Sequence, residues 1–241
     1  MLVILTGAGI SQESGIATFR DAGGLWENMR VEDVATPGGF RRNPDMVYAF
    51  YNARRRQLQD GGVAPNAAHR ALARLERESA APMLLVTQNV DDLHERGGSA
   101  EVLHMHGELF KARCVACGAV AQWECDLDAA SVCSGCGKAG HMRPHIVWFE
   151  EMPLYMDTIA SALARCTTFV SIGTSGNVYP AAGFASTARS AGARVVEINM
   201  EPSCNARVFH EGFYGPASRE VPAWVETYLA ASCGGAAKTF L

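Results

Sequence analysis

The chain has 241 residues, of which 48% are hydrophobic and 19% charged, and its formal net charge is −4 at pH 7. This composition is typical of a soluble globular protein with one core, or with one large domain and a small appendage. A pI near 6.0 argues against bulk electrostatic binding of nucleic acid or of an anionic membrane, and no apolar run is long enough to span a bilayer.

The chain starts with "MLVILTGAG", which has no basic lead and no cleavage site. We therefore expect a strand over residues 2–6 and no signal peptide. Eight cysteines, only some of which lie in paired motifs, favour a reducing, cytoplasmic setting with metal ligation.

Short apolar runs alternate with helical patterns along the rest of the chain. Each run has the length of a strand that is buried on both faces of a parallel sheet. We expect strands over residues 2–6, 83–87, 167–173 and 194–199, and helices over 44–59, 66–79, 157–165, 180–191 and 221–231. This alternation predicts βαβ units and an α/β fold with a doubly wound parallel sheet.

The first strand leads into "TGAGISQESGIATFRDAGGLW" at residues 6–26. Gly7 and Gly9 would let the backbone approach a phosphate, and a helix beginning near Ser11 would face the anion. Arg20 could reach a pyrophosphate or a ribose while Phe19 covers a ring. The alternative is a purely structural strand–helix turn, because the third glycine of the dehydrogenase fingerprint is absent.

The helix expected over 44–59 carries an arginine within an otherwise apolar stripe. At about 100° per residue, this stripe contains Val47, Tyr51, Arg54 and Leu58. Arg55 and Arg56 turn away from it. A guanidinium buried in the stripe without a partner would cost several kcal/mol, so Arg54 either meets an anion or extends to solvent.

A polar segment, "TQNVDDLH" at 87–94, follows the second predicted strand at its carboxyl end, where open α/β sheets bind ligands. Gln88, Asn89 and Asp91 suit hydrogen bonding to sugar hydroxyls and to a carboxamide. The alternative is that Asp91 and Asp92 cap a helix.

Two histidines, His104 and His106, lie in "LHMHGELF" at strand spacing, which would point them to opposite faces. One of them should be buried, and the other could enter the cleft. The alternative is that such a histidine is a hydrogen-bonded core residue.

Two further strand ends carry polar turns. Gly173, Thr174 and Ser175 follow one of them, and Asn199 and Glu201 follow the other. Together with the two earlier segments they give four polar turns at the carboxyl edge of one sheet, which predicts a dinucleotide cleft better than any one turn does.

Two C-x2-C pairs, "RCVACG" and "VCSGCG", contain Cys114, Cys117, Cys133 and Cys136. Four thiolates fill a tetrahedral Zn²⁺ and leave no position for a water, so the predicted zinc is structural and not hydrolytic. Asp126, Asp128 and His141 are interpreted as loop residues and not as ligands.

Taken in order, these segments resemble the sirtuin family of NAD-dependent protein-lysine deacylases, from Gly7 to about Pro222. The motifs that carry the resemblance are "GAGIS", "TQNVDDLH", the "HG" at 106–107 and the zinc cysteines. The resemblance implies a Rossmann-like NAD-binding domain and a small domain made of a helical module and a four-cysteine zinc module. The expected boundaries are 1–30, 61–106 and 148–241 for the first domain, and 31–60 and 107–147 for the second.

The resemblance also implies roles for individual residues. The residues implied to bind NAD are Gly7, Ala8, Gly9, Phe19, Arg20, Trp26, Gln88, Asn89, Asp91, Gly173, Thr174, Ser175, Asn199, Met200, Glu201 and Ala217. His106 matches the family's general base, with Asn89 and Asp91 as its catalytic partners. The acyl oxygen of lysine would displace nicotinamide, and His106 would then accept a ribose hydroxyl proton so that 2′-O-acyl-ADP-ribose forms. A histidine pKa near neutrality suits this transfer.

The arginine-containing helix resembles the class III branch of sirtuins. In that branch a Tyr-x-x-Arg pair, here Tyr51 and Arg54, would hold the terminal carboxylate of succinyl-, malonyl- or glutaryl-lysine, and the small Ala35 would leave room for the longer chain. One charge-assisted hydrogen bond of this kind is worth about 1.5–3 kcal/mol. Deacetylation is expected as a second activity, and the alternative is an enzyme that is predominantly a deacetylase.

The segment "RPHIVWFEEMP" at 143–153 resembles the family's substrate-pairing strand, so we expect Val147 and Phe149 to contact the peptide. Glu150 stands where the family usually has glycine. If the backbone there has a positive φ, the glutamate would cost about 1 kcal/mol or more.

Two other functions are disfavoured. An NAD-dependent oxidoreductase would need the complete glycine fingerprint. A non-catalytic module that binds ADP-ribose or nucleic acid would not need the set of His106, Asn89 and Asp91, and the acidic balance also argues against it. The expected partners are acyl-lysine proteins or peptides, with no direct nucleic acid and no membrane, and a monomer is compatible with the sequence.

Overall fold

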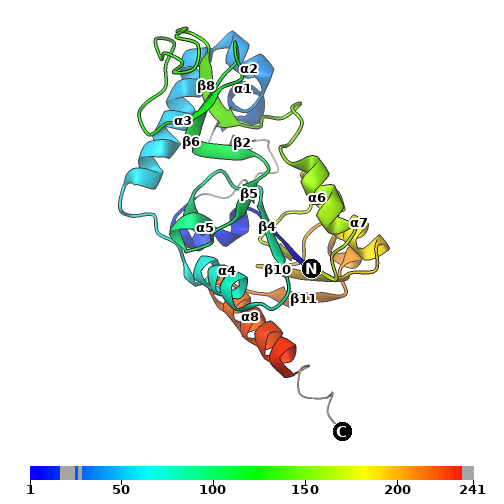
Figure 1. Ribbon diagram of the computed structural model, residues 1–241. Helices are drawn as coiled ribbons and strands as arrows, with labels where there is room; N and C mark the ends of the chain where they lie inside the picture. Colours follow the sequence, from blue (N-terminus) through cyan, green and yellow to red (C-terminus); the bar gives the residue numbers. More distant parts are fainter. Residues whose placement is uncertain (17–24, 27–28, 235–241) are drawn as a thin grey trace.

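The computed structural model describes residues 1–16, 25–26 and 29–234 of the chain. Its central element is a six-stranded sheet in which every neighbouring pair is parallel. In spatial order the strands are β11 (Glu211–Tyr214), β10 (Arg194–Asn199), β9 (Thr168–Ile172), β1 (Leu2–Thr6), β4 (Met83–Thr87) and β5 (Val102–His104). The predicted doubly wound α/β sheet is confirmed (Figure 1).

Helices cover both faces of the sheet, and successive side chains of each strand point to opposite faces, so each strand packs against helices on both sides. On one face, Leu2 and Ile4 of β1 pack with α4 (Ala67–Glu78) and α8 (Ala217–Gly234). On the other face, Val3 and Leu5 pack with α6 (Met156–Leu163) and α7 (Phe184–Ser190). The near-continuous apolar strand sequences follow from this two-sided cover.

The C-terminal helix starts four residues earlier than the predicted 221. Pro222 lies within this helix, near its start. In the structure the helix begins at Ala217, and Glu13 caps it by accepting hydrogen bonds from the Ser218 backbone N–H at 2.9 Å and hydroxyl at 2.7 Å. This cap comes from a residue 205 positions away in the chain.

A second group of elements, which we call the small module, lies above the sheet in Figure 1. It contains three helices, α1 (Val31–Val34), α2 (Pro37–Arg42) and α3 (Pro44–Gln59), and a three-stranded antiparallel sheet. The order in that sheet is β7 (Val120–Gln122), β6 (Gly107–Cys114) and β8 (Met142–Ile146). Asn43 accepts a hydrogen bond from the Met46 N–H, and this cap followed by Pro44 fixes the start of α3 where the sequence predicts it.

The remaining elements are short. They are η1 (Ala8–Ile10), η2 (Gln12–Ser14), β2 (Leu25–Trp26), β3 (Met29–Arg30), α5 (Leu93–Arg96), η3 (Ala181–Gly183) and η4 (Ala206–Val208). The α-helix predicted to begin near Ser11 is wrong: the described residues there form the two 3₁₀ turns η1 and η2. Gly15, with φ of 89°, ends the second turn in the left-handed region, so the helical pattern is not extended.

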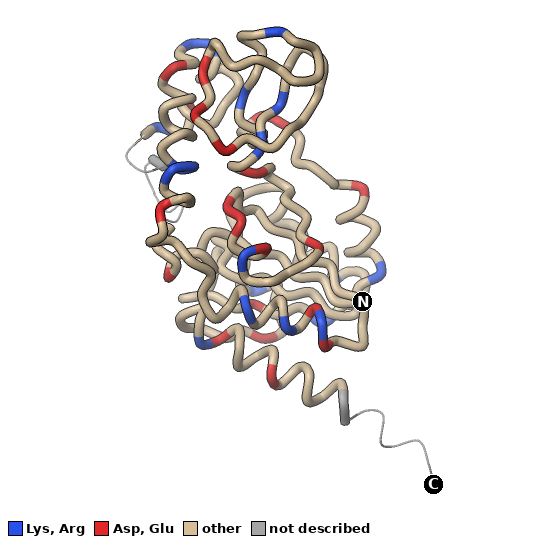
Figure 2. Tube along the Cα trace, turned by 60° about the vertical axis from the view of Figure 1, so that its left-hand side comes forward, with Lys and Arg blue, Asp and Glu red and all other residues tan. Residues whose placement is uncertain are grey.

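Charged side chains of both signs are interspersed along both parts of the molecule (Figure 2). Within the described part of the chain, none of the helices combines the length and the apolar character that crossing a membrane requires.

Candidate active site

The carboxyl ends of β1 and β9 meet at the point where the sheet reverses its strand order, because β1 lies between β9 and β4. Gly9 donates its backbone N–H to the Gly173 carbonyl at 2.9 Å. A Cβ atom on Gly9 would lie 2.7 Å from the Gly173 Cα, and Gly173 itself has a φ of 63°. The two turns therefore pack backbone against backbone, and here glycine is required for that contact.

Asn89 and Asp91 follow β4 and lie beside the first turn. The Asn89 side-chain amide donates to the Gly7 carbonyl at 3.2 Å and to the Ser11 hydroxyl oxygen at 3.1 Å. Ser11 in turn donates to the Asp91 carboxylate at 3.2 Å. The buried Ser11 therefore links Asn89 to Asp91. The sequence analysis did not predict Ser11 as a site residue, although it belongs to the "GAGIS" motif.

Burial raises the pKa of Asp91 to about 6, although the Leu93 N–H and the Ser11 hydroxyl partly oppose the shift by bonding to the charged form. The carboxyl is therefore poised to change charge just below neutral pH. Asp91 also accepts a hydrogen bond of 3.1 Å from the Leu93 N–H at the start of α5, but the N-cap residue of this helix is Asp92, whose side chain makes no capping hydrogen bond.

His104 and His106 hold two consecutive peptide carbonyls. The Nδ1 atom of His104 lies 3.1 Å from the Asn89 carbonyl, and the Nδ1 atom of His106 lies 3.1 Å from the Gln88 carbonyl. The expectation of opposite faces does not follow from their spacing, because residues two apart lie on the same face of a strand. In addition, β5 ends at His104, and His106 lies in the turn that follows.

The hydrogen bond of His106 fixes its tautomer. A carbonyl oxygen only accepts, so Nδ1 carries the proton and Nε2 is left as the basic nitrogen. Burial lowers the pKa of His106, partly against the effect of the Gln88 carbonyl. The ring is consequently neutral at neutral pH, as a general base must be.

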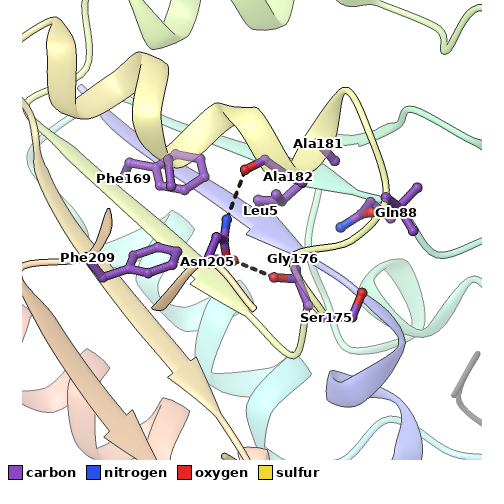
Figure 3. Close-up of a pocket in the computed structure, with 13 residues that line it drawn as sticks. Leu5, Gln88, Phe169, Ser175, Gly176, Ala181, Ala182, Asn205 and Phe209 are labelled. Atoms are coloured by element: carbon purple, nitrogen blue, oxygen red, sulfur yellow. Dashed lines mark hydrogen bonds between the residues drawn. The ribbon is translucent and has the colours of Figure 1, made fainter. Parts of the chain in front are cut away.

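Two cavities flank Gly173 and Thr174 at the edge of the sheet. The first, shown in Figure 3, has Gln88 and Ser175 on one side and Phe169 and Phe209 on the other. Thr174 also lines this cavity, and the Asn205 amide crosses it to donate to the Ala182 carbonyl at 2.9 Å.

The second cavity brings together residues from four separate turns. Its lining includes Gly9, Gly173, Asn199, Met200 and Ala217. Asn199 is held there by donating its side-chain amide to the Thr174 carbonyl at 2.8 Å. Glu201 is exposed and lies outside both linings.

Tyr51 and Arg54 lie on one face of α3 and are buried. Trp148 donates its indole N–H to the Tyr51 hydroxyl oxygen at 3.0 Å. Arg54 is 8% exposed, its Nη1 donates to the Phe50 carbonyl at 2.7 Å, and its guanidinium carbon lies 3.3 Å from the centre of the Phe50 ring. The alternative that Arg54 extends to solvent is therefore wrong.

Arg55 turns away from the stripe of Tyr51 and Arg54, as the helix period predicts, but it is also buried, with 1% of its surface exposed. It donates to the carbonyls of Leu109 at 2.9 Å and Cys125 at 3.1 Å, and to the Asn52 amide oxygen at 2.8 Å. Asn52 exchanges two hydrogen bonds of 2.9 Å with the backbone of Leu127. A helix period cannot show that the loop between the cysteine pairs covers this second face.

The segment that follows β8 is fixed by an ionic network. Glu151 pairs with Arg143 and Arg113, both at 2.7 Å, and accepts the Trp148 N–H at 2.9 Å. These partners lower the pKa of Glu151 in spite of its burial. Arg143 also lies over the Trp148 ring at 3.2 Å, so the network fixes the indole that contacts Tyr51.

Two backbone hydrogen bonds place this segment beside the small module and beside His106. Val147 donates its N–H to the His106 carbonyl at 2.8 Å, and Phe149 donates to the Ala35 carbonyl at 2.9 Å. Glu150 has a φ of 73°, which is the left-handed conformation anticipated for a position suited to glycine.

The sulfur atoms of Cys114, Cys117, Cys133 and Cys136 all lie within 4.8 Å of one another. Two of the separations are 3.8 Å and 3.7 Å, close to the edge of roughly 3.8 Å that Zn–S bonds of about 2.3 Å give in a tetrahedron. Asp126, Asp128 and His141 are not part of this cluster. The four thiols fit a structural zinc.

Some predicted site residues cannot be placed. Phe19 and Arg20 lie outside the described residues, as does the side chain of Trp26. The remaining predicted residues of the sheet edge lie within or beside the two cavities and the Asn89–Asp91 cluster, apart from the exposed Glu201.

Comparison with known proteins agrees with this geometry. The sequence model of the Sir2 family matches residues 7–180. The NAD-dependent protein deacylase SIR2rp3 of Trypanosoma brucei brucei is 56% identical over 231 residues, which cover 95% of each chain. The NAD-dependent protein deacylase of Escherichia coli strain K12 is 57% identical over 228 residues, which cover 95% of this chain and 82% of that protein.

A solved complex of a Sir2 homolog with NAD has a TM-score of 0.86 and 36% identity, and it covers 96% of this chain and 90% of the other. The fold, the cysteine cluster and the sequence relationships agree with one another. The chain therefore belongs to the Sir2 family and is an NAD-dependent protein deacylase with NAD as cosubstrate.

Proposed function

We propose that this deacylase preferentially removes acyl groups that end in a carboxylate, namely succinyl, malonyl and glutaryl groups, from lysine side chains of proteins or peptides. Removal of acetyl groups is a second activity of the same site. The observation that carries the proposal is the guanidinium of Arg54, which is 8% exposed and lies one helical turn from the buried Tyr51.

The chemistry of these two side chains favours an anionic acyl chain. A guanidinium presents several N–H donors in one plane and matches a carboxylate in shape and charge. The neighbouring hydroxyl of Tyr51 can donate to the same group, and burial raises its pKa, so it stays protonated. A charge-assisted hydrogen bond of about 1.5–3 kcal/mol corresponds to a preference of one to two orders of magnitude per contact.

The same proposal assigns roles in the cleft. His106 is the general base, since its Nε2 is unprotonated in the tautomer that the Gln88 carbonyl selects. Asn89 and Asp91 position the ribose and the carboxamide. The residues assigned to NAD are Gly7, Ala8, Gly9, Phe19, Arg20, Trp26, Gln88, Gly173, Thr174, Ser175, Asn199, Met200, Glu201 and Ala217.

With NAD bound, nicotinamide would leave the anomeric carbon of its ribose as the acyl oxygen of lysine bonds to that carbon. His106 then takes the proton of a ribose hydroxyl at Nε2, so that this hydroxyl oxygen accepts the acyl group. A water would add to the acyl carbon as the lysine nitrogen leaves it, so the products are free lysine, nicotinamide and 2′-O-acyl-ADP-ribose. Ala35, Val147 and Phe149 line the path of the acyl-lysine, and Phe149 is joined to Ala35 through the backbone.

The small module, with the boundaries 31–60 and 107–147, carries the acyl-recognition helix and the structural zinc in this proposal. The proposal also includes a cytoplasmic location, because none of the seven cysteines that the structure describes forms a disulfide.

The proposal is tested with one peptide that carries either succinyl- or acetyl-lysine. The wild type should show the larger kcat/KM on the succinyl peptide, with the acyl-ADP-ribose product identified by mass. Arg54→Met should reduce desuccinylation at least tenfold more than deacetylation. Arg56→Met, on an exposed arginine two residues later, is the matched control and should change the ratio little.

Two results would count against this acyl preference. A wild-type enzyme that favours the acetyl peptide would support the alternative of a predominant deacetylase. Equal losses on both peptides in Arg54→Met would mean that the arginine only supports the helix.

A further inference from the structure

His104 is buried, with 4% of its surface exposed, and both of its ring nitrogens have partners. Nδ1 lies 3.1 Å from the Asn89 carbonyl oxygen, and Nε2 lies 2.7 Å from a carboxylate oxygen of Glu95. The Glu95 side chain is two-fifths exposed, whereas the imidazole is enclosed. The ring thus joins the carboxyl end of β4 to α5.

Both partners of this ring are acceptors. A main-chain carbonyl has no proton to give, and neither has an ionised carboxylate. Two good hydrogen bonds to acceptors require a proton on each nitrogen, which is the imidazolium form. We infer that His104 is a cationic positioning residue that fixes the Asn89 main chain for the deacylation reaction.

The surroundings favour the charged ring on balance. Glu95 on α5, Glu108 on β6 and Asp91 after β4 are the acidic groups that interact with it. A charged His94 on α5 would repel the His104 cation, but burial lowers the pKa of His94 so far that it stays neutral. Burial by itself disfavours the charge, but the bond to Glu95 outweighs it and the pKa of His104 is raised.

The effect on Asn89 is direct because its backbone and side-chain N–H donors are also held. Its backbone N–H donates to the Thr87 hydroxyl at 3.0 Å, and its side chain donates to Gly7 and Ser11. His104 supplies the contact at the carbonyl oxygen. When the ring loses a proton, one nitrogen turns a lone pair toward an acceptor, and that contact becomes repulsive.

The inference predicts opposite behaviour for the two histidines of the "HMH" segment. His106 has one carbonyl partner and must be neutral to act as a base, whereas His104 has two acceptor partners and acts as a cation. Activity should therefore fall at acid pH as His106 and Asp91 take up protons, and at alkaline pH as His104 loses one. This reasoning rests on the proposed role of Asn89.

The first test is a titration of the intact enzyme followed by nitrogen-15 NMR of its histidine rings. The expected result is a His104 ring with two protonated nitrogens at pH 6.5 and a pKa above 6.5, and a His106 ring with Nδ1 protonated and a pKa below 6.5. A singly protonated His104 at pH 6.5 overturns the inference without reference to any variant.

The second test uses Glu95→Gln, which keeps the shape of the side chain and removes its charge. The pKa of His104 should fall, and the alkaline limb of kcat should move to lower pH by the same amount. Glu101 is an exposed carboxylate directly before β5, and Glu101→Gln is the matched control. It should leave the His104 pKa and the alkaline limb of kcat unchanged. His104→Gln should lower kcat about tenfold and flatten the alkaline limb.

The outcomes separate this inference from the proposed function. If Glu95→Gln shifts the His104 titration but not the kcat profile, the ring is only structural and the inference fails. If Asn89→Ala also retains full activity, the proposed role of Asn89 fails with it.

Discussion

Trp148 and Tyr51 join the segment after β8 to helix α3 through one buried hydrogen bond of 3.0 Å, from the indole N–H to the phenolic oxygen. Arg143 stacks on the same indole, and Glu151 holds both Arg143 and the Trp148 backbone. The orientation of the Tyr51 hydroxyl is therefore set by a network that lies outside its own helix.

Replacing Trp148 by Phe should weaken acyl discrimination. The variant keeps an aromatic ring below Arg143 but leaves the buried Tyr51 oxygen without this donor, which costs about 1–3 kcal/mol of unfolding free energy. The midpoint temperature of thermal unfolding and the succinyl-to-acetyl ratio of kcat/KM should both decrease. Tyr51→Phe is the matched control, because a similar ratio in both variants shows that they act through the same hydroxyl.

His106→Ala should bind NAD but turn over slowly. Removing a positioned general base costs typically 10²–10⁴-fold in rate, and the Gln88 carbonyl loses only one donor. Calorimetric titration with NAD and single-turnover kinetics measure the two effects separately. Retained turnover would exclude His106 as the base.

Asp91→Asn should stabilise the protein near pH 7 while it lowers activity. The pKa of Asp91 is about 6 in the fold and 3.8 as a free group, so folding opposes the charged form. The cost is absent below pH 3.8, grows as pH rises to about 6, and then stays constant at no more than about 3 kcal/mol. Denaturant unfolding at pH 4 and pH 7 should show a gain only at pH 7.

The exposed carboxylate of Asp60 supplies the control for this comparison. Asp60→Asn should change the unfolding free energy equally at the two pH values. A pH-independent gain in Asp91→Asn would show that burial of the charge is not its cause.

Glu150→Gly should raise thermal stability without loss of the fold. Glu150 has a φ of 73°, and glycine adopts this conformation without the Cβ penalty of about 1 kcal/mol or more. For a chain of this size 1 kcal/mol corresponds to about 2–4 °C in Tm. Glu150→Ala keeps the Cβ but removes the charge, so its Tm should stay near that of the wild type.

Chelation of zinc should unfold the small module and thereby lower activity. The four thiolates would lose the ion that joins the two knuckles, and binding of such an ion contributes directly to folding. Circular dichroism and metal content should change together. Cys117→Ser should behave like the chelated protein, whereas Cys125→Ser, which lies outside the cluster, should keep one zinc per chain.

The strands and the zinc cluster could be predicted because their signals are local. Residues 2–6 and 83–87 are continuous apolar runs, and both match β1 and β4 to the residue. β5 was missed because it has only three residues, and its last one, His104, was assigned to a longer histidine-containing strand.

The errors at the site have a common physical cause, which is contact with a distant part of the chain. The burial of Arg55 could not be predicted, because its partners, Leu109 and Cys125, lie more than fifty residues away. Ser11 was taken as the start of a helix, yet its hydroxyl contacts Asn89 and Asp91. Residue types and spacing brought the polar turns to one edge of the sheet, but they could not show which side chains share a hydrogen bond.

The two faces of α3 contact different parts of the molecule. Tyr51 contacts Trp148 in the segment after β8, and Arg54 stacks on Phe50, whereas Asn52 and Arg55 anchor the helix to the loop between the cysteine pairs. On the proposed role of Tyr51 and Arg54, redesign of the enzyme toward a new lysine modification would vary positions 51 and 54 together in a library. Positions 52 and 55 should be kept unchanged in that library, so that new pockets are screened on an unaltered scaffold.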